Sequence, residues 1–240
     1  MPSRRSFIKG GLAAGSGLAL GVPRLAPVDA AQQPPDQAAL AEADFEYIPL
    51  YFNPDEMRFL RAACSRLIPA DDVGPGAVEL GVPEFLDRQM AGPFGYAVTW
   101  YMQGPFYDGY EEQGWQSRRN PRQLYRDAIR AIDEAVGAAN DGKVFAELPP
   151  QEQDKVLKAL HKGQYKLDGV NGGLFFSWLL TNTKEGYFAD PMYGGNRNMG
   201  SWRMLGFPGA RGEFTAWVGR GDEHYPLPPV SIRNPTGEVG

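Results

Sequence analysis

Residues 53–69 read NPDEMRFLRAACSRLIP, and this stretch decides the class of the fold. It opens with an asparagine suited to cap a helix, a proline suited to the first helical position, and two acidic residues where the helix dipole favours negative charge. Apolar residues then recur at helical spacing until Pro69 ends the pattern. The stretch therefore predicts a helix that packs against a hydrophobic core.

The same kinds of signal predict four further helices. Prolines near the start or glycines after the end mark them, and apolar residues recur along one face of each. Their expected ranges are 82–90, 120–140, 150–161 and 173–184. No stretch alternates between apolar and polar residues at period two, so there is no sign of βαβ units. The expected fold class is mainly α, a single helical domain with long irregular loops rich in glycine, proline and aromatic residues.

The composition agrees with one domain of this kind. The 240 residues are 42% hydrophobic and 12% aromatic, which is enough for a substantial core, while 30 glycines and 21 prolines predict long irregular stretches. The net charge is −5, and an acidic chain argues against nucleic acid as a partner. We expect the irregular loops to be ordered by contact with another surface.

The first nine residues resemble a twin-arginine export signal. The string at residues 3–9 is SRRSFIK, and its signal residues are Arg4, Arg5, Phe7 and Lys9. The apolar run 10–22 behind it is too short to span a membrane, which needs about 20 apolar residues. An ordinary secretory signal, or a basic stretch without meaning, is the alternative. The twin-arginine route, as the resemblance implies, exports proteins that have already folded.

These features divide the chain into three expected parts. Residues 1–30 are the signal peptide, with a cut after Ala30, and residues 31–44 are a polar tether. Residues 45–240 are the helical domain, whose C-terminal part is irregular from about residue 186. Removal of the signal peptide would change the net charge from −5 to −8, because four basic residues and one acidic residue leave with it. The expected location is the periplasm.

Cys64 is the only cysteine of the chain, so no internal disulfide can form. It lies among apolar residues on the first predicted helix, and this position indicates a buried thiol that packs as a small apolar group. The alternative is a covalent link to a partner subunit, because export leads to a compartment where disulfides form.

Recognisable cofactor motifs are absent from the sequence. It has no glycine-rich dinucleotide fingerprint after a strand and no phosphate-binding loop. A lone cysteine excludes covalent haem attachment and cysteine-based iron or zinc sites. We therefore expect no cofactor and no metal on this chain.

A few polar residues are still candidates for chemistry. Asp71 and Asp72 could bind a hard cation or act in acid-base catalysis, although adjacent acids after a helix end more often form a turn. His224, beside a glutamate in a proline-rich tail, could bind a metal, whereas His161 indicates a solvated helix terminus. The alternative function is a stand-alone periplasmic hydrolase assisted by a metal at Asp71 and Asp72 or at His224.

Residues 185–209 are the most informative part of the second half. They combine glycines, prolines and large aromatics without periodicity, which predicts an irregular loop whose aromatic area is buried by something other than a regular element. Tyr, Trp, Met and Arg are enriched in interface cores, so partner contact and folding back onto the chain's own helices are equal alternatives. The residues expected at or near a partner surface are Tyr193, Arg197, Trp202, Arg203 and Phe207.

Three blocks of this sequence carry a resemblance to a known family. The first block is LIPADD at 67–72 with GPGA at 74–77, the second is VPEFLD at 82–87, and the third is DPMYGGNR at 190–197 followed by Trp202 and GFPG at 206–209. They resemble the gluconate 2-dehydrogenase subunit 3 family, the small (gamma) subunits of membrane-associated, flavin-dependent sugar and sugar-acid dehydrogenases. With the twin-arginine start, the resemblance covers most of the expected mature domain.

The resemblance implies an accessory subunit without chemistry of its own. Such subunits escort a large subunit, a flavoprotein of the glucose-methanol-choline type that lacks an export signal and acquires FAD in the cytoplasm. A cytochrome c subunit with haem commonly accepts the electrons. The implied partners are therefore a flavoprotein, a cytochrome c and the twin-arginine translocase, at the periplasmic face of the inner membrane. Family members serve gluconate, fructose, glucose and the 3-hydroxyl of glycosides, and the small subunit does not reveal which.

Overall fold

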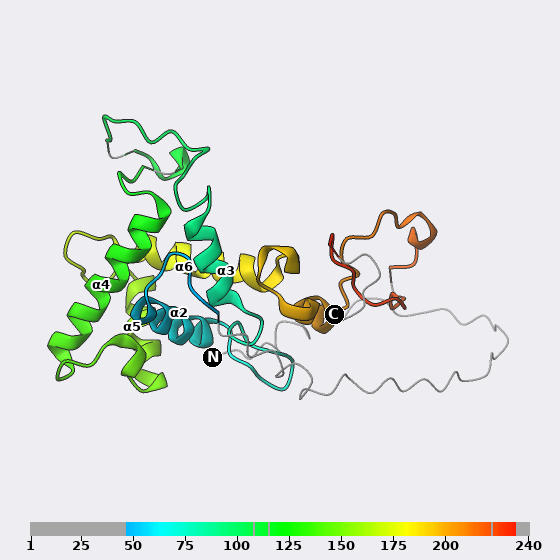
Figure 1. Ribbon diagram of the computed structural model, residues 1–240, viewed down its shortest axis with the longest axis horizontal. Coiled ribbons are helices and arrows are strands. Elements are labelled where there is room, and N and C mark those ends of the chain that lie inside the picture. The colour runs from blue at the N-terminus through cyan, green and yellow to red at the C-terminus, as the bar shows by residue number, and fades with distance from the viewer. Residues whose placement is uncertain (1–46, 108, 115, 222, 234–240) are drawn as a thin grey trace, which may run out of the picture. The chain divides into compact units, whose positions relative to one another are not determined.

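The computed structural model describes residues 47–107, 109–114, 116–221 and 223–233 (Figure 1). The expected signal peptide with Arg4, Arg5, Phe7 and Lys9, and the expected tether at 31–44, lie outside these residues. Both stay predictions.

Helices make up the regular structure of the described residues (Figure 1). Their bounds are α2 (Pro54–Leu67), α3 (Val82–Ala91), α4 (Pro121–Ala139), α5 (Pro150–His161), α6 (Gly172–Phe188) and α7 (Gly200–Leu205). Short 3-10 helices lie at η2 (Glu111–Gln113), η3 (Phe145–Glu147), η4 (Pro191–Tyr193), η5 (Arg197–Met199) and η6 (Thr215–Trp217). These residues contain no strand, only the isolated bridges Leu167–Val170 and Gly209–Val230. The predicted class, a mainly α domain, is confirmed for this part of the chain.

The helix starts follow from capping side chains that the sequence predicts. At α2 the Asn53 side chain accepts from the Glu56 backbone N–H at 2.8 Å, and the Glu56 side chain accepts from the Asn53 N–H at 2.9 Å. Asn120 and Gln123 make the same reciprocal pair at α4, with both distances 3.0 Å. Such a pair satisfies two backbone donors that a helix start leaves free.

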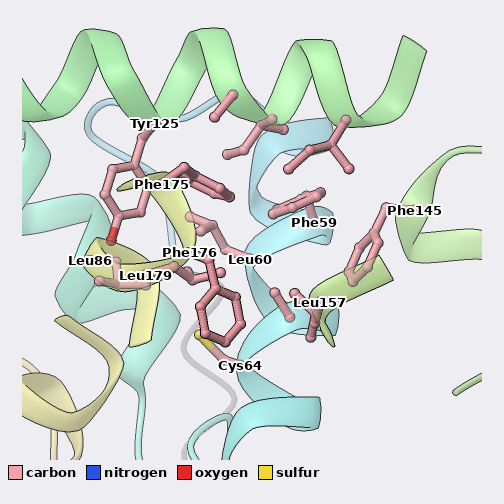
Figure 2. Close-up of a cluster of buried hydrophobic side chains, with 14 of the residues drawn as sticks. Phe59, Leu60, Cys64, Leu86, Tyr125, Phe145, Leu157, Phe175, Phe176 and Leu179 are labelled. Carbon is pink, nitrogen blue, oxygen red and sulfur yellow. The ribbon is translucent and has the colours of Figure 1, made fainter. Parts of the chain in front are cut away.

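The core lies where five helices meet, and α6 packs against α2, α3, α4 and α5. Figure 2 shows side chains from several elements interleaved in it. The ring centroid of Phe59 lies 4.6 Å from that of Phe145 and 6.2 Å from that of Phe175, which in turn lies 5.3 Å from Tyr125. Burial of such aromatic side chains is the main favourable term in folding.

Cys64 lies within this core (Figure 2). Its Sγ is 3.7 Å from the Thr183 hydroxyl, and burial raises the pKa of the Cys64 thiol to about 12. The interpretation as a buried apolar thiol is confirmed. A disulfide to a partner would need Sγ at the surface, so that alternative is wrong.

The segment before α2 is fixed by one buried carboxylate, that of Asp87 on α3. Its Oδ1 accepts from the backbone N–H groups of Tyr51 at 3.0 Å and Phe52 at 2.8 Å. Its Oδ2 accepts from the Leu50 N–H at 2.6 Å and from the Tyr47 hydroxyl at 2.7 Å. Burial and this bond raise the pKa of Tyr47 above its usual range. Asp87 thus sets the path of residues 47–52.

Two helical segments differ from the sequence-based expectation. The helix predicted to end at residue 184 continues to Phe188, so the supposed irregular loop begins later. Gly200–Leu205 forms α7, which the sequence did not predict. Asn198 and Met199, just before α7, adopt positive φ of 53° and 56°. These conformations are uncommon for residues other than glycine and depend on tertiary contacts, so no local signal marks this helix start.

No helix in the described ranges is long and apolar enough to cross a membrane.

Candidate partner-binding surface

The three sequence blocks that carry the family resemblance meet in space. The Arg197 N–H, in the third block, donates to the Leu80 carbonyl, just before the second block, at 3.1 Å. The Tyr187 hydroxyl at the end of α6 donates to the Pro75 carbonyl of the first block at 2.7 Å. The residues of the family pattern therefore build one joint between the 69–81 loop, α3 and the segment after α6.

A buried acid lies at the centre of this joint. Glu84 on α3 is 2% exposed and pairs with Arg61 on α2, while its Oε2 lies 3.8 Å from Nη2 of Arg197. Gly81 has a φ of +73°, and a Cβ there would lie 2.7 Å from Nε of Arg197. Only glycine combines that backbone with space for the arginine. Arg197 therefore packs against its own chain on one side, while 48% of its side chain is exposed.

Two polar side chains order the segment after α6 from inside. Asn196 is fully buried; its amide donates to the Ala189 carbonyl at 2.9 Å, and its carbonyl accepts from the Ser201 N–H and hydroxyl. Asp190 accepts from the Ser231 hydroxyl at 2.7 Å and from the Ile232 N–H at 2.8 Å. Buried polar groups need such partners, so this segment is ordered by its own chain.

A glycine contact within the joint gives a stability prediction. A Cβ at Gly195 would lie 2.2 Å from the Gly186 carbonyl oxygen, so the backbone must shift. We expect Gly195→Ala to lower the free energy of unfolding by about 2 kcal/mol, measured by denaturant titration. Gly212→Ala is the matched control, because a Cβ there meets nothing within 4 Å. Equal stability of the two variants would show that the contact is unimportant.

The five residues predicted at a partner surface do not share one environment. Tyr193 and Phe207 are 49% and 47% exposed and are available to another protein. Trp202 is 6% exposed, and its indole N–H donates to the Phe188 carbonyl at 2.9 Å. Nε of Arg203 donates to the Asn198 carbonyl at 3.0 Å. Partner contact at these residues stays a prediction, and Tyr193 and Phe207 are the side chains with which to test it.

A second group of exposed aromatics, which was not predicted from the sequence, lies between α3 and α4. Tyr96, Tyr101, Tyr107 and Tyr110 are between 55% and 81% exposed. Their stretch has the same sequence signature as 185–209, aromatics and glycines without periodicity, and that signal could have identified it. Exposed tyrosine is typical of interface residues, because it offers a large amphipathic surface.

Arginines surround a cavity next to Tyr96. The cavity has a volume of about 630 Å³ and is lined by Tyr51, Arg118, Arg119, Arg122, Gln123, Arg126 and Asp127. We call it the arginine pocket. The guanidinium carbon of Arg122 lies 4.1 Å from the ring centroid of Tyr51 and 4.0 Å from that of Tyr96. The arginine pocket was not predicted from the sequence either, because its residues come from separate segments.

The residues considered for chemistry lie in a turn or at the surface. Oδ1 of Asp71 accepts from the Val73 and Gly74 N–H groups at 3.0 and 3.2 Å, so the turn interpretation is confirmed. Asp72 and His224 are exposed, as is His161 at the end of α5. Among the residues that the structure describes, no three His, Cys, Asp or Glu side chains are grouped to hold a metal ion.

The protein is helical, and its three sequence blocks form an internal joint. Its exposed tyrosines and arginines are residue types that suit protein binding. The family model for gluconate 2-dehydrogenase subunit 3 matches residues 54–209, more than half of the chain, and the chain belongs to this family. Membership implies a subunit of a dehydrogenase complex. No curated protein and no solved structure matched the chain.

Proposed function

We propose that this chain is the non-catalytic small subunit of a periplasmic, FAD-dependent dehydrogenase of sugars, sugar acids or glycosides. The observation that carries the proposal is the family match over residues 54–209, which includes the three sequence blocks that meet in the joint. The three blocks order the segment after α6 at the surface. A fixed surface segment suits a subunit that binds a partner through this face.

The proposal divides the work between chains. FAD belongs to a large subunit of the glucose-methanol-choline type, which oxidises the substrate, and a cytochrome c subunit with haem takes up the electrons. This chain binds the folded large subunit in the cytoplasm, carries the twin-arginine signal with Arg4 and Arg5, and escorts the partner across the membrane. A folded-export signal on a chain without a cofactor motif is reasonable if the cofactor travels on the partner.

The partner face in this proposal includes the exposed rings of Tyr193 and Phe207. Trp202 packs beneath Phe207, with 5.2 Å between the two ring centroids, and its indole N–H donates to the Phe188 carbonyl. Replacement of Trp202 would therefore disturb the fold as well as the surface. Tyr193 and Phe207 separate the two effects better.

An activity assay tests the division of labour. We expect the isolated chain to reduce no electron acceptor with gluconate, fructose, glucose or glycosides, while the chain with its co-purified flavoprotein does. Substrate turnover by the isolated chain would contradict the proposal. Glycoside hydrolysis together with stoichiometric metal binding would favour the hydrolase alternative at Asp71, Asp72 or His224.

A further inference from the structure

The arginine pocket has an unbalanced set of charges. Four arginines line it, and the acid among its lining residues is Asp127. Nε of Arg119 donates to Asp127 at 2.7 Å, and Nε of Arg126 donates to Glu56 at 2.8 Å. These two arginines are neutralised within the chain, whose overall net charge is −5.

The other two arginines have no acceptor in the described part of the chain. Among the described residues, the side chain of Arg122 donates no hydrogen bond, and its buried Nη1 has no partner there. Arg118 contacts the Phe106 ring, 5.9 Å from its guanidinium carbon to the ring centroid, and forms no ion pair among these residues. An unpartnered guanidinium is a strong donor group that a carboxylate satisfies through two parallel hydrogen bonds.

Aromatic rings hold one of these arginines in place before any ligand arrives. The guanidinium carbon of Arg122 lies at about equal distances from the ring centroids of Tyr51 and Tyr96. The ring centroid of Tyr51 also lies 4.2 Å from the guanidinium carbon of Arg126. Tyr51 is fixed in turn by the buried Asp87. Because the side chain is already ordered, it loses little conformational entropy when an acid binds.

The surroundings of the pocket indicate a protein rather than a small anion as the source of the acid. Tyr96, which covers Arg122, is 55% exposed, and it belongs to the same connection as Tyr101, Tyr107 and Tyr110. Tyr96 offers contact area beside the charged site, and the other three rings line a second cavity in the same connection. Tyrosine and arginine together are the residue types enriched at protein interfaces.

We propose that the arginine pocket binds a carboxylate-bearing acidic segment of the flavoprotein large subunit. The inference rests on the proposed function and adds a second contact to the face around Tyr193 and Phe207. Arg118 and Arg122 receive the acid, and Tyr96 lies beside it.

A substitution inside the pocket tests this without damage to the helix. Gln123 lines the pocket, and its side chain caps α4 by accepting from the Asn120 N–H. Glu at this position keeps the cap, because Glu and Gln serve equally there, but it places a negative charge beside the arginines. We expect Gln123→Glu to weaken flavoprotein binding about tenfold or more at low salt, with a thermal midpoint no lower than that of the wild type, because the helix dipole favours an acid there.

Gln151→Glu is the matched control. Gln151 is exposed in the first turn of α5 and does not line the pocket, so the same change of charge should leave affinity unaltered. Binding of the purified flavoprotein to each immobilised full-length variant, at low and high salt, gives the comparison. The difference between the two variants should shrink at high salt, since screening weakens charge contacts.

Arg118→Gln is a second variant that keeps the inference testable if Gln123→Glu unfolds. Arg118 is exposed and forms no ion pair among the described residues, so the chain should fold normally and bind with reduced affinity and a smaller salt dependence. Affinities of Gln123→Glu and Arg118→Gln equal to that of Gln151→Glu would overturn the inference while leaving the proposed function intact. Absence of any wild-type complex with a flavoprotein would instead contradict the proposed function, and the inference with it.

Discussion

Replacement of Asp87 with asparagine should lower the free energy of unfolding by about 3 kcal/mol. The two carboxylate oxygens of this buried side chain accept three backbone N–H groups and the Tyr47 hydroxyl. Asparagine offers one acceptor oxygen and one NH₂ group. Whichever way the amide lies, its NH₂ faces at least one backbone donor, and that donor is left buried without an acceptor.

The consequences should extend to the surface. Loss of the Asp87 contacts frees residues 50–52, which exposes the core residue Phe52 and releases Tyr51 from beneath Arg122. Denaturant titration followed by circular dichroism measures the stability. Asp55→Asn is the control, because Asp55 is exposed and its pair with Arg58 is a surface ion pair worth less than about 1 kcal/mol. An Asp87 variant no less stable than this control would show that the carboxylate does not organise the segment.

Replacement of Arg4 and Arg5 together by lysine should abolish export of both chains. Lysine keeps the positive charges of the signal, so an effect would depend on recognition of the arginines by the translocase and not on net charge. In the proposal the flavoprotein has no signal of its own and depends on this chain for export. In periplasmic fractions, the immunoblot signals of both subunits and the dehydrogenase activity should fall to background.

A matched change at another arginine gives the control for this experiment. Arg24 follows the apolar run, so Arg24→Lys should leave export unaltered. Normal periplasmic flavoprotein in the Arg4 and Arg5 variant would mean that the partner reaches the periplasm independently. The escort role would then be wrong, although the two chains could still form a complex.

The helices were largely predictable because their signals are local. Asn53 and Asn120 cap their helices through partners three residues away, and a proline follows each of them. Apolar spacing then marks the buried face, as for Leu60 and Cys64 in α2. Such features act within one or two helical turns, so the local sequence is enough to predict these helices.

The surface could not be predicted in the same way. Aromatic composition predicted Trp202 at an interface, which stays a prediction, but it gave no sign that the indole is bonded to the Phe188 carbonyl and buried. The pairing of Arg197 with Glu84 joins positions more than a hundred residues apart, and the arginine pocket combines Tyr51 with the start of α4. Composition predicts that an aromatic or arginine will be in contact, whereas only the fold decides whether its partner is internal or external.

The central claim is that this chain exists to carry and hold a flavoprotein, and native mass spectrometry of the affinity-purified chain from the periplasm tests it most directly. The expected result is a non-covalent complex of this chain with a larger chain that contains FAD. When Tyr193 and Phe207 are both replaced by alanine, this chain should be recovered without the flavin-containing subunit. Recovery of this chain alone, with dehydrogenase or hydrolase activity of its own, would contradict the claim.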